Sequence, residues 1–143
     1  MSDSLPCVCT TLRKASRAIT RVYDDRLAAS GLTTTQFAVL RNLDRHGTLP
    51  LSRLADILVM DRTTLYRTLV PIERHSWITI GDGQTGRTKL AALTEIGRTV
   101  MNSATVAWEA TQADIIGTIG ATQWQVLEEQ LRHLAETPLE RAA

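Results

Sequence analysis

Residues 51–69 read LSRLADILVMDRTTLYRTL, and residues 77–90 read WITIGDGQTGRTKL. Asp61, a favoured N-cap, divides the first stretch into two segments with apolar residues at helical spacing, which predicts two short consecutive helices. Three glycines then separate the runs 77–80 and 88–93, which predicts a β-hairpin. Two helices followed by a glycine-tipped hairpin are typical of a winged helix-turn-helix.

The flanking sequence predicts further helices on both sides. The pattern over 8–29 predicts a helix that stops at Gly31, and the next helix is expected to end at His46-Gly47. After the hairpin, a helix of about 22 residues is expected to point Ile96 inward and to be broken by Gly117 and Gly120. The predicted helix-opening residues are Thr33 or Thr34, Ser52, Asp61, Thr94 and Thr122. The expected order is α-α-α-α-β-β-α-α, with room for a short strand near Leu51.

Length and composition favour one soluble domain, 1–143. The chain is 43% hydrophobic and 22% charged, which is ordinary for a globular protein with a real core. No apolar run approaches the roughly 20 residues of a membrane span, and the N-terminus has no signal-peptide pattern. We therefore expect a cytoplasmic protein without a membrane partner. Cys7 and Cys9 are too few for a disulfide framework.

The charges are unevenly distributed along the chain. The net charge is only +1, but residues 1–93 carry 13 Lys/Arg against 8 Asp/Glu, and residues 94–143 carry 3 against 7. A basic part and an acidic part in one chain favour nucleic-acid binding at one end only.

The second helix of the pair, from Asp61 onward, has a polar face suited to reading DNA. On a helical wheel Leu65, Leu69 and Ile72 point inward together, which leaves the first turns of the other face polar. Arginine can bond guanine with both of its terminal nitrogens, and threonine can contact either base edges or the thymine methyl group. A merely solvated face is the alternative. The predicted DNA-reading residues are Arg62, Thr63, Thr64, Tyr66 and Arg67.

The hairpin supplies two further candidates. Arg87 and Lys89 flank its tip, and an arginine on a flexible hairpin can enter a narrow minor groove, where the potential is most negative. A solvated hairpin charge is again the alternative reading.

The stretches GLTTTQFAVL (31–40), 51–69 and RTKLAALTEIG (87–97) together resemble the multiple-antibiotic-resistance regulator (MarR) family over essentially the whole chain. The resemblance implies an obligate homodimer on a pseudo-palindromic double-stranded operator, usually a repressor released by a small molecule or an oxidant. The DNA-binding lobe is expected over 33–93. The terminal helices carry more apolar surface than a compact winged domain needs, which suggests a dimerisation layer from 5–30 and 94–143. The wing GDGQTGR departs from the family, which usually carries an acidic and basic cluster there.

The resemblance also suggests an effector site between the winged lobe and the dimerisation layer. By that analogy Arg13, Arg17, Tyr23 and Phe37 would hold an aromatic carboxylate or a phenol, with guanidinium groups for the charge and rings for stacking. Each of the four is equally readable as structural, since the arginines could form interface ion pairs and Phe37 could be core.

Cys9 is a candidate redox switch. In the organic-hydroperoxide-sensing branch of the family a reactive Cys precedes a Ser-Arg pair and a Tyr at the spacings that Cys9 has to Ser16-Arg17 and Tyr23. A thiol near a helix N-terminus is favoured as a nucleophile. That branch has two further tyrosines where this chain has Arg13 and Thr34. The alternative is that both cysteines pack at a dimer interface.

Other classes are less favoured. No nucleophile–base pair or convergent carboxylates indicate an enzyme, and no cofactor motif is present. The histidines are scattered and Cys7-x-Cys9 is not a zinc spacing, so no metal site is predicted. A protein-interaction module would carry an apolar outward face on the helix after Asp61. Val70 is the apolar residue that the helical wheel places on that face.

Overall fold

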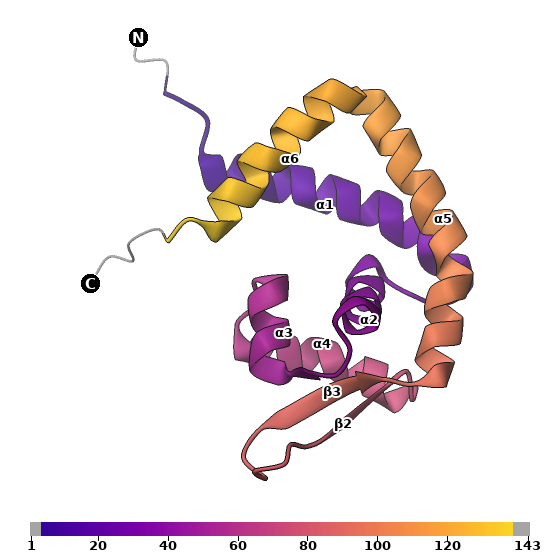
Figure 1. Cartoon of the computed structure of the whole chain (residues 1–143). Coiled ribbons are helices and arrows are strands. Elements are labelled where there is room, and N and C mark those ends of the chain that lie inside the picture. The colour runs from indigo at the N-terminus through magenta and orange to yellow at the C-terminus, as the bar shows by residue number, and fades with distance from the viewer. Residues whose placement is uncertain (1–3, 139–143) are drawn as a thin grey trace. The chain divides into compact units, whose positions relative to one another are not determined.

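The computed structural model describes residues 4–138 and has the predicted mainly α architecture. The last residues of the predicted dimerisation segment, 139–143, lie outside the described part. The chain divides into two compact units, one up to Trp108 and one from Glu109 onward. The elements (Figure 1) are α1 (Val8–Leu27), the 3-10 turn η1 (Ala28–Ser30), α2 (Thr34–His46), β1 (Leu49–Pro50), α3 (Leu51–Leu58), α4 (Arg62–Arg74), β2 (Ile78–Asp82), β3 (Lys89–Leu93), α5 (Glu95–Ile119) and α6 (Ala121–Glu136).

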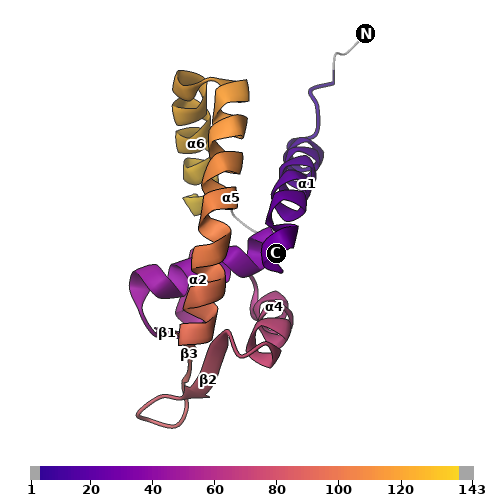
Figure 2. The same cartoon turned by 90° about the vertical axis from the view of Figure 1, so that its right-hand side faces the viewer.

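A three-stranded antiparallel sheet connects the hairpin to the helix pair. The strand order is β1-β3-β2, and Ala91 of β3 lies opposite both Leu49 of β1 and Ile80 of β2. Because β1 leads directly into α3, the wing is joined to the helix-turn-helix through its central strand. Figure 2 shows the β2–β3 hairpin projecting at the lower edge of the first unit, with α4 beside it.

The core of the first unit lies between α2, α3, α4 and the sheet. Leu65, Leu69 and Ile72 of α4 are buried as predicted, against residues such as Leu40 and Leu54. Fully burying one such side chain contributes about 1.5–3 kcal/mol, so this face fixes the orientation of α4.

The start of α2 is held by two caps. Thr33 and Gln36 form the reciprocal capping box, with side-chain bonds of 3.2 and 3.0 Å to each other's backbone N–H groups. In addition, Asp24 of α1 accepts a hydrogen bond from the Thr34 N–H at 2.7 Å. This second cap ties α1 to α2.

Several predicted boundaries are wrong. Ser52 is not a cap, because α3 begins at Leu51 after Pro50, and Thr122 lies inside α6, which follows Gly120. Gly117 lies inside α5, because a helix tolerates an interior glycine at a cost of about 1 kcal/mol. The helix ends before Gly120, whose φ of +100° suits glycine. Ile96 is 57% exposed rather than inward.

Both units expose apolar helix surface in the single chain. In the first unit α1 exposes Val8, Leu12, Ile19 and Val22, and Leu27 is its only buried residue among those described. In the second unit α6 contains no buried residue along its described length. No helix within residues 4–138 is long and apolar enough to cross a membrane.

Candidate nucleic-acid interface

Asp61 sets the start of α4. Its Oδ1 accepts a hydrogen bond from the Thr64 backbone N–H at 2.7 Å, as the sequence predicts for an N-cap. The same backbone bond, together with one from the Thr64 side chain, lowers the pKa of the Asp61 carboxyl below its ordinary value. Residues 62–67 therefore form the first turns of α4, the part of such a helix that reaches a DNA groove first.

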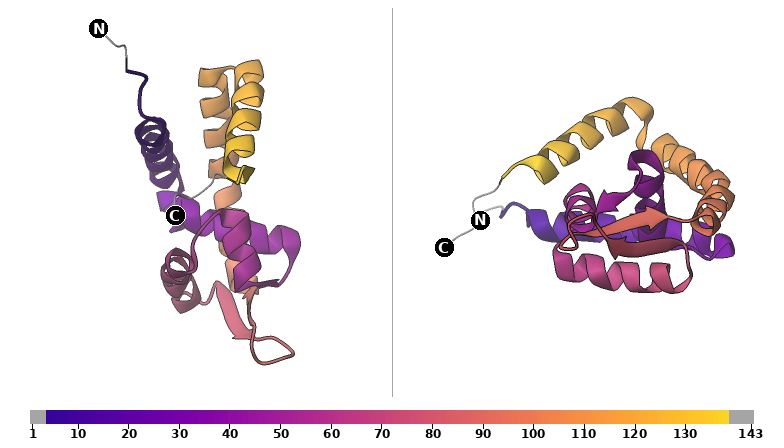
Figure 3. Two further views of the ribbon diagram at one scale, coloured as in Figure 1. Left: turned by 90° about the vertical axis from the view of Figure 1, so that its left-hand side faces the viewer. Right: turned by 60° about the horizontal axis from the view of Figure 1, so that its bottom comes forward.

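The outward face of α4 is polar. All five residues predicted to read DNA are exposed, and Tyr66 is 50% exposed. Val70 is also exposed, one turn further on. Figure 3, in its right-hand view, looks onto the face that carries α4 and the hairpin side by side.

A hollow of about 180 Å³ lies between α4, the start of α3 and the wing. It brings Arg62 and Tyr66 of α4 together with Arg87 and Lys89 of the wing, whereas Thr63, Thr64 and Arg67 do not line it. Sequence reasoning missed Ser52 and Thr88 here, because their placement depends on the sheet register rather than on local pattern. The lining residues are Leu51, Ser52, Arg62, Leu65, Tyr66, Arg87, Thr88 and Lys89.

The two wing cations differ in their surroundings. Lys89 lies opposite Asp82 in the hairpin, and its Nζ is 2.5 Å from the Asp82 Oδ1. This hydrogen-bonded charge raises the pKa of Lys89. Arg87 is exposed and forms no ion pair within residues 4–138. The wing therefore presents one uncompensated positive charge, on Arg87.

The candidate effector residues lie apart. Arg13 and Arg17 are exposed on α1, and Tyr23, ten residues after Arg13, lies about 15 Å further along the helix. Tyr23 is partly buried, and burial raises its pKa. Phe37 is only 2% exposed, so it belongs to the core of the first unit.

An aromatic stack lies beside Phe37. The ring centroids of Phe37 and Trp108 are 5.6 Å apart. The guanidinium carbon of Arg41 lies 3.9 Å from the centroid of the Trp108 ring. Arg41 was not among the residues predicted from the sequence. The usable signal was its position four residues after Phe37, on the same face of α2.

The thiols lie at the start of α1. Cys7 is the N-cap residue, Cys9 lies in the first turn, and both are exposed. Hydrogen bonds from the side chain and backbone of Thr10 lower the pKa of Cys7. Within residues 4–138 no three His, Cys, Asp or Glu side chains are grouped so that they could hold a metal ion.

Known proteins that resemble this chain are transcriptional regulators. The sequence profile of the MarR family matches residues 32–79. The M. tuberculosis transcriptional regulator MosR, in complex with DNA, is 32% identical, with a TM-score of 0.84 over 91% of this chain and 94% of that chain. The chain belongs to the MarR family of transcriptional regulators. No curated protein matches the sequence.

More distant structures share the fold. Bordetella bronchiseptica BpsR, studied for the regulation of its DNA binding by 6-hydroxynicotinic acid, is 19% identical, with a TM-score of 0.83 over 93% of this chain and 96% of that chain. CouR from Rhodococcus jostii RHA1, bound to p-coumaroyl-CoA, is 17% identical, with a TM-score of 0.79 over 95% of this chain and 96% of that chain.

Proposed function

We propose that this chain is a homodimeric repressor that binds a pseudo-palindromic operator and is released by a small aromatic or phenolic ligand. The observation that carries DNA binding is the hollow in which Arg62 and Tyr66 meet Arg87 from the wing. Two arginines and a tyrosine around one hollow suit a backbone phosphate, since most protein–DNA hydrogen bonds go to phosphates and sugars.

Base reading then falls to the residues outside the hollow. Thr63, Thr64 and Arg67 are exposed on the first turns of α4, and their side chains suit base edges in the major groove. A relative at 32% identity, MosR, has been crystallised with DNA, which supports the same partner here.

Dimerisation is supported by exposed apolar surface. Val8, Leu12, Ile19 and Val22 recur along α1 and are exposed in the single chain. An apolar stripe of that length needs a cover, and a second copy supplies one with matching symmetry. Analytical ultracentrifugation should show a dimer, and Ile19→Asp should dissociate it.

Effector binding is supported by the chemistry of α1 and α2 and by the ligands of BpsR and CouR. Arg13 and Arg17 are exposed and offer charge, and the partly buried Tyr23 offers a ring, whereas Phe37 is held in the core against Trp108, over which Arg41 also lies. A panel of aromatic acids and phenols should contain compounds that raise the melting temperature and weaken DNA binding. If no compound does either, the effector proposal is wrong.

The DNA proposal is tested with the region upstream of the protein's own gene and with duplexes selected from random sequence. The full-length protein should prefer its selected site by about 10³-fold or more over unrelated DNA at physiological salt. Equal affinity for all duplexes, or none, would favour the protein-interaction alternative, for which Val70 on the outward face is the supporting residue.

A thiol switch is the second candidate for release, favoured by two exposed thiols at the start of α1. The thiolate is the nucleophile towards a hydroperoxide. Treatment with an organic hydroperoxide should then weaken operator binding, and Cys9→Ser should abolish the response, with Cys7→Ser as the comparison. An unchanged affinity after treatment would exclude the switch.

A further inference from the structure

The C-terminal end of α4 is tightly tied to the start of β2. The Ser76 N–H donates to the Glu73 carbonyl at 2.9 Å, and the Trp77 N–H donates to the Ile72 carbonyl at 3.2 Å. Ser76 has a φ of +61°, so the chain turns at that one residue. Ile72 is fully buried, so the residue that accepts the Trp77 N–H is itself anchored in the core.

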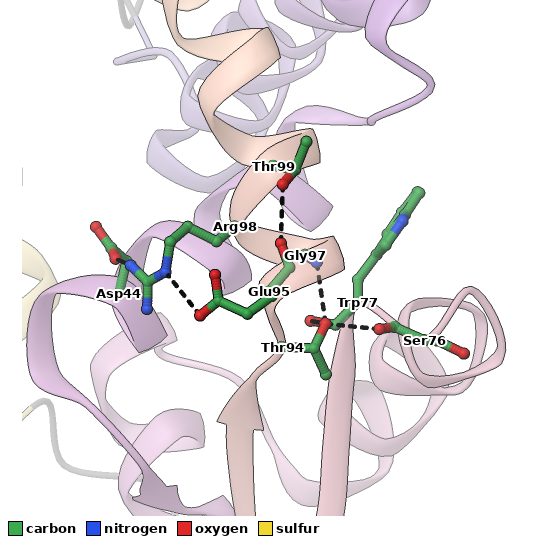
Figure 4. Close-up of polar contacts among 8 residues, drawn as sticks. All are labelled: Asp44, Ser76, Trp77, Thr94, Glu95, Gly97, Arg98 and Thr99. Atoms are coloured by element: carbon green, nitrogen blue, oxygen red, sulfur yellow. Dashed lines mark hydrogen bonds and ion pairs between the residues drawn. The ribbon is translucent and has the colours of Figure 1, made fainter.

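The first turn of α5 is bonded to this same turn (Figure 4). The Thr94 N–H donates to the Trp77 carbonyl at 3.0 Å, and the Thr94 hydroxyl lies 2.6 Å from the Ser76 carbonyl. The hydroxyl oxygen also accepts a hydrogen bond from the Gly97 N–H at 2.9 Å. One side chain thus caps α5 and holds the end of α4.

Gly97 allows this close contact. A Cβ at this position would lie 2.0 Å from the Trp77 carbonyl oxygen and 2.8 Å from its carbon. Gly97 has an ordinary helical backbone conformation, so its own φ does not call for glycine. Glycine is needed there because the Trp77 backbone approaches so closely. Any larger residue would have to separate α5 from Trp77.

A second tie holds the same turn of α5 from another side. Arg98 forms an ion pair with Asp44 near the end of α2, and its Nε lies 3.8 Å from the Glu95 carboxylate. The first turn of α5 is therefore fixed both to α2 and to the end of α4, as the two groups of contacts in Figure 4 show.

We propose that Thr94 and Gly97, through their contacts with Ser76 and Trp77, set the angle between α4 and α5 and thereby the half-site spacing that the protein accepts. The four residues are called the α5 joint below. The inference rests on the proposed function, in which a dimer that associates through 5–30 and 94–143, α5 included, places two copies of α4 on one operator. Thr94 and Gly97 are positioning residues in this role, since they act on DNA through α4.

The geometry explains why spacing is the property affected. α4 has 13 residues and is about 20 Å long, so opening the joint at its C-terminal end tilts the N-terminal end that carries Arg62. Half-sites are read one helical turn apart, and adding one base pair displaces a half-site by about 3.4 Å with a rotation. A tilt of α4 therefore changes which spacing fits and leaves the contacts within one half-site intact.

The test uses the full-length protein and DNA selected from random duplexes. Affinity is measured for the selected operator, for versions with one base pair inserted or removed at its centre, and for a single half-site. The wild-type protein should prefer its own spacing by about tenfold or more. Gly97→Ala and Thr94→Val should lose that preference or move it to another spacing, with half-site affinity unchanged.

Two matched variants control for structural damage. Gly117→Ala makes the same substitution in the same helix, at a position where a Cβ meets nothing within 4 Å among residues 4–138, and should keep the wild-type preference. Thr94→Ser keeps the hydroxyl and should restore the preference that Thr94→Val loses.

The outcomes separate the two proposals. If wild type discriminates spacing and a folded Gly97→Ala or Thr94→Val variant does so equally, the α5 joint has no positioning role. A uniform loss on every duplex, the half-site included, equally overturns it. If Gly97→Ala does not fold, Thr94→Val and Thr94→Ser decide the question. If wild type itself shows no site preference, the proposed function has failed instead.

Discussion

Arg87 is expected to supply the wing's net electrostatic contribution to DNA binding. It lines the hollow and has no ion pair within residues 4–138, whereas Lys89 is paired with Asp82 at 2.5 Å. Replacing Arg87 with Ala should therefore remove one phosphate contact per subunit. Replacing both members of the Asp82–Lys89 pair with Asn and Gln changes the same surface but leaves its net charge unchanged.

The magnitude follows from counterion release. A dimer of Arg87→Ala loses two phosphate contacts, so the slope of log affinity against log salt should become shallower by about 1.8. Between 50 and 200 mM salt, a fourfold change, the variant should lose about twelvefold less affinity than the wild-type protein. The variant should bind all duplexes more weakly, with its ranking of sequences unchanged, because phosphate contacts carry no direct sequence information.

Fluorescence anisotropy with a labelled operator at several KCl concentrations gives these slopes. The Asp82→Asn/Lys89→Gln protein should have nearly the wild-type slope. A wild-type slope in Arg87→Ala would refute the assignment of the charge to Arg87. A slope in the double variant as shallow as that of Arg87→Ala would show that the ion pair does not neutralise Lys89.

Three further outcomes are expected. Arg67→Ala should cost about 1–3 kcal/mol of specific binding and relax preference at one base position, measured by competition with singly substituted operators, and an unchanged preference would remove Arg67 from base reading. Val59 is 71% exposed and has a φ of 53°, a left-handed conformation that asparagine tolerates better than valine. Val59→Asn should therefore raise the free energy of unfolding by about 1 kcal/mol, measured in urea at fixed protein concentration. The control Val70→Asn, within α4, should not. Asp61 has a lowered pKa in the folded protein, so its stabilising contribution is full above about pH 4 and is lost as the pH falls through its folded pKa. Asp61→Asn should therefore show a smaller fall in stability between pH 5 and pH 3 than wild type, and an equal fall would contradict this role of the carboxylate.

Local patterns predicted the winged helix-turn-helix part of the fold well. Asp61, Thr94 and either Thr33 or Thr34 were predicted as helix caps from their residue types. The structure shows that Asp61, Thr94 and Thr33 each accept a hydrogen bond from the backbone N–H three residues ahead. The polar face of α4 was likewise predictable, since its inward leucines recur at helical spacing and are buried.

Contacts between distant segments were not predictable in this way. Ser52 failed as a cap because Pro50 pairs with Leu90 in the sheet, and this pairing places the start of α3 at Leu51. Ile96 faces solvent because Gly97, its neighbour, takes the position against Trp77.

The candidate site was predictable by residue and not by arrangement. Arg62, Arg87 and Lys89 were identifiable from helix and hairpin patterns, but the hollow that joins them forms only when α3, α4 and the wing meet. Lys89 and Asp82 are paired because the hairpin register places them opposite each other. That register could not be predicted from residue composition. The dimer, the operator and the effector remain predictions.

The two-residue strand β1 has a consequence for how this protein behaves at high concentration. It forms one edge of the sheet, and its second residue, Pro50, has no N–H group to offer. A short edge that lacks a donor is a poor template for an incoming strand, so it does not seed the ordered stacking that leads to fibres. Concentrated protein should associate through its exposed helices without growing sheets at β1.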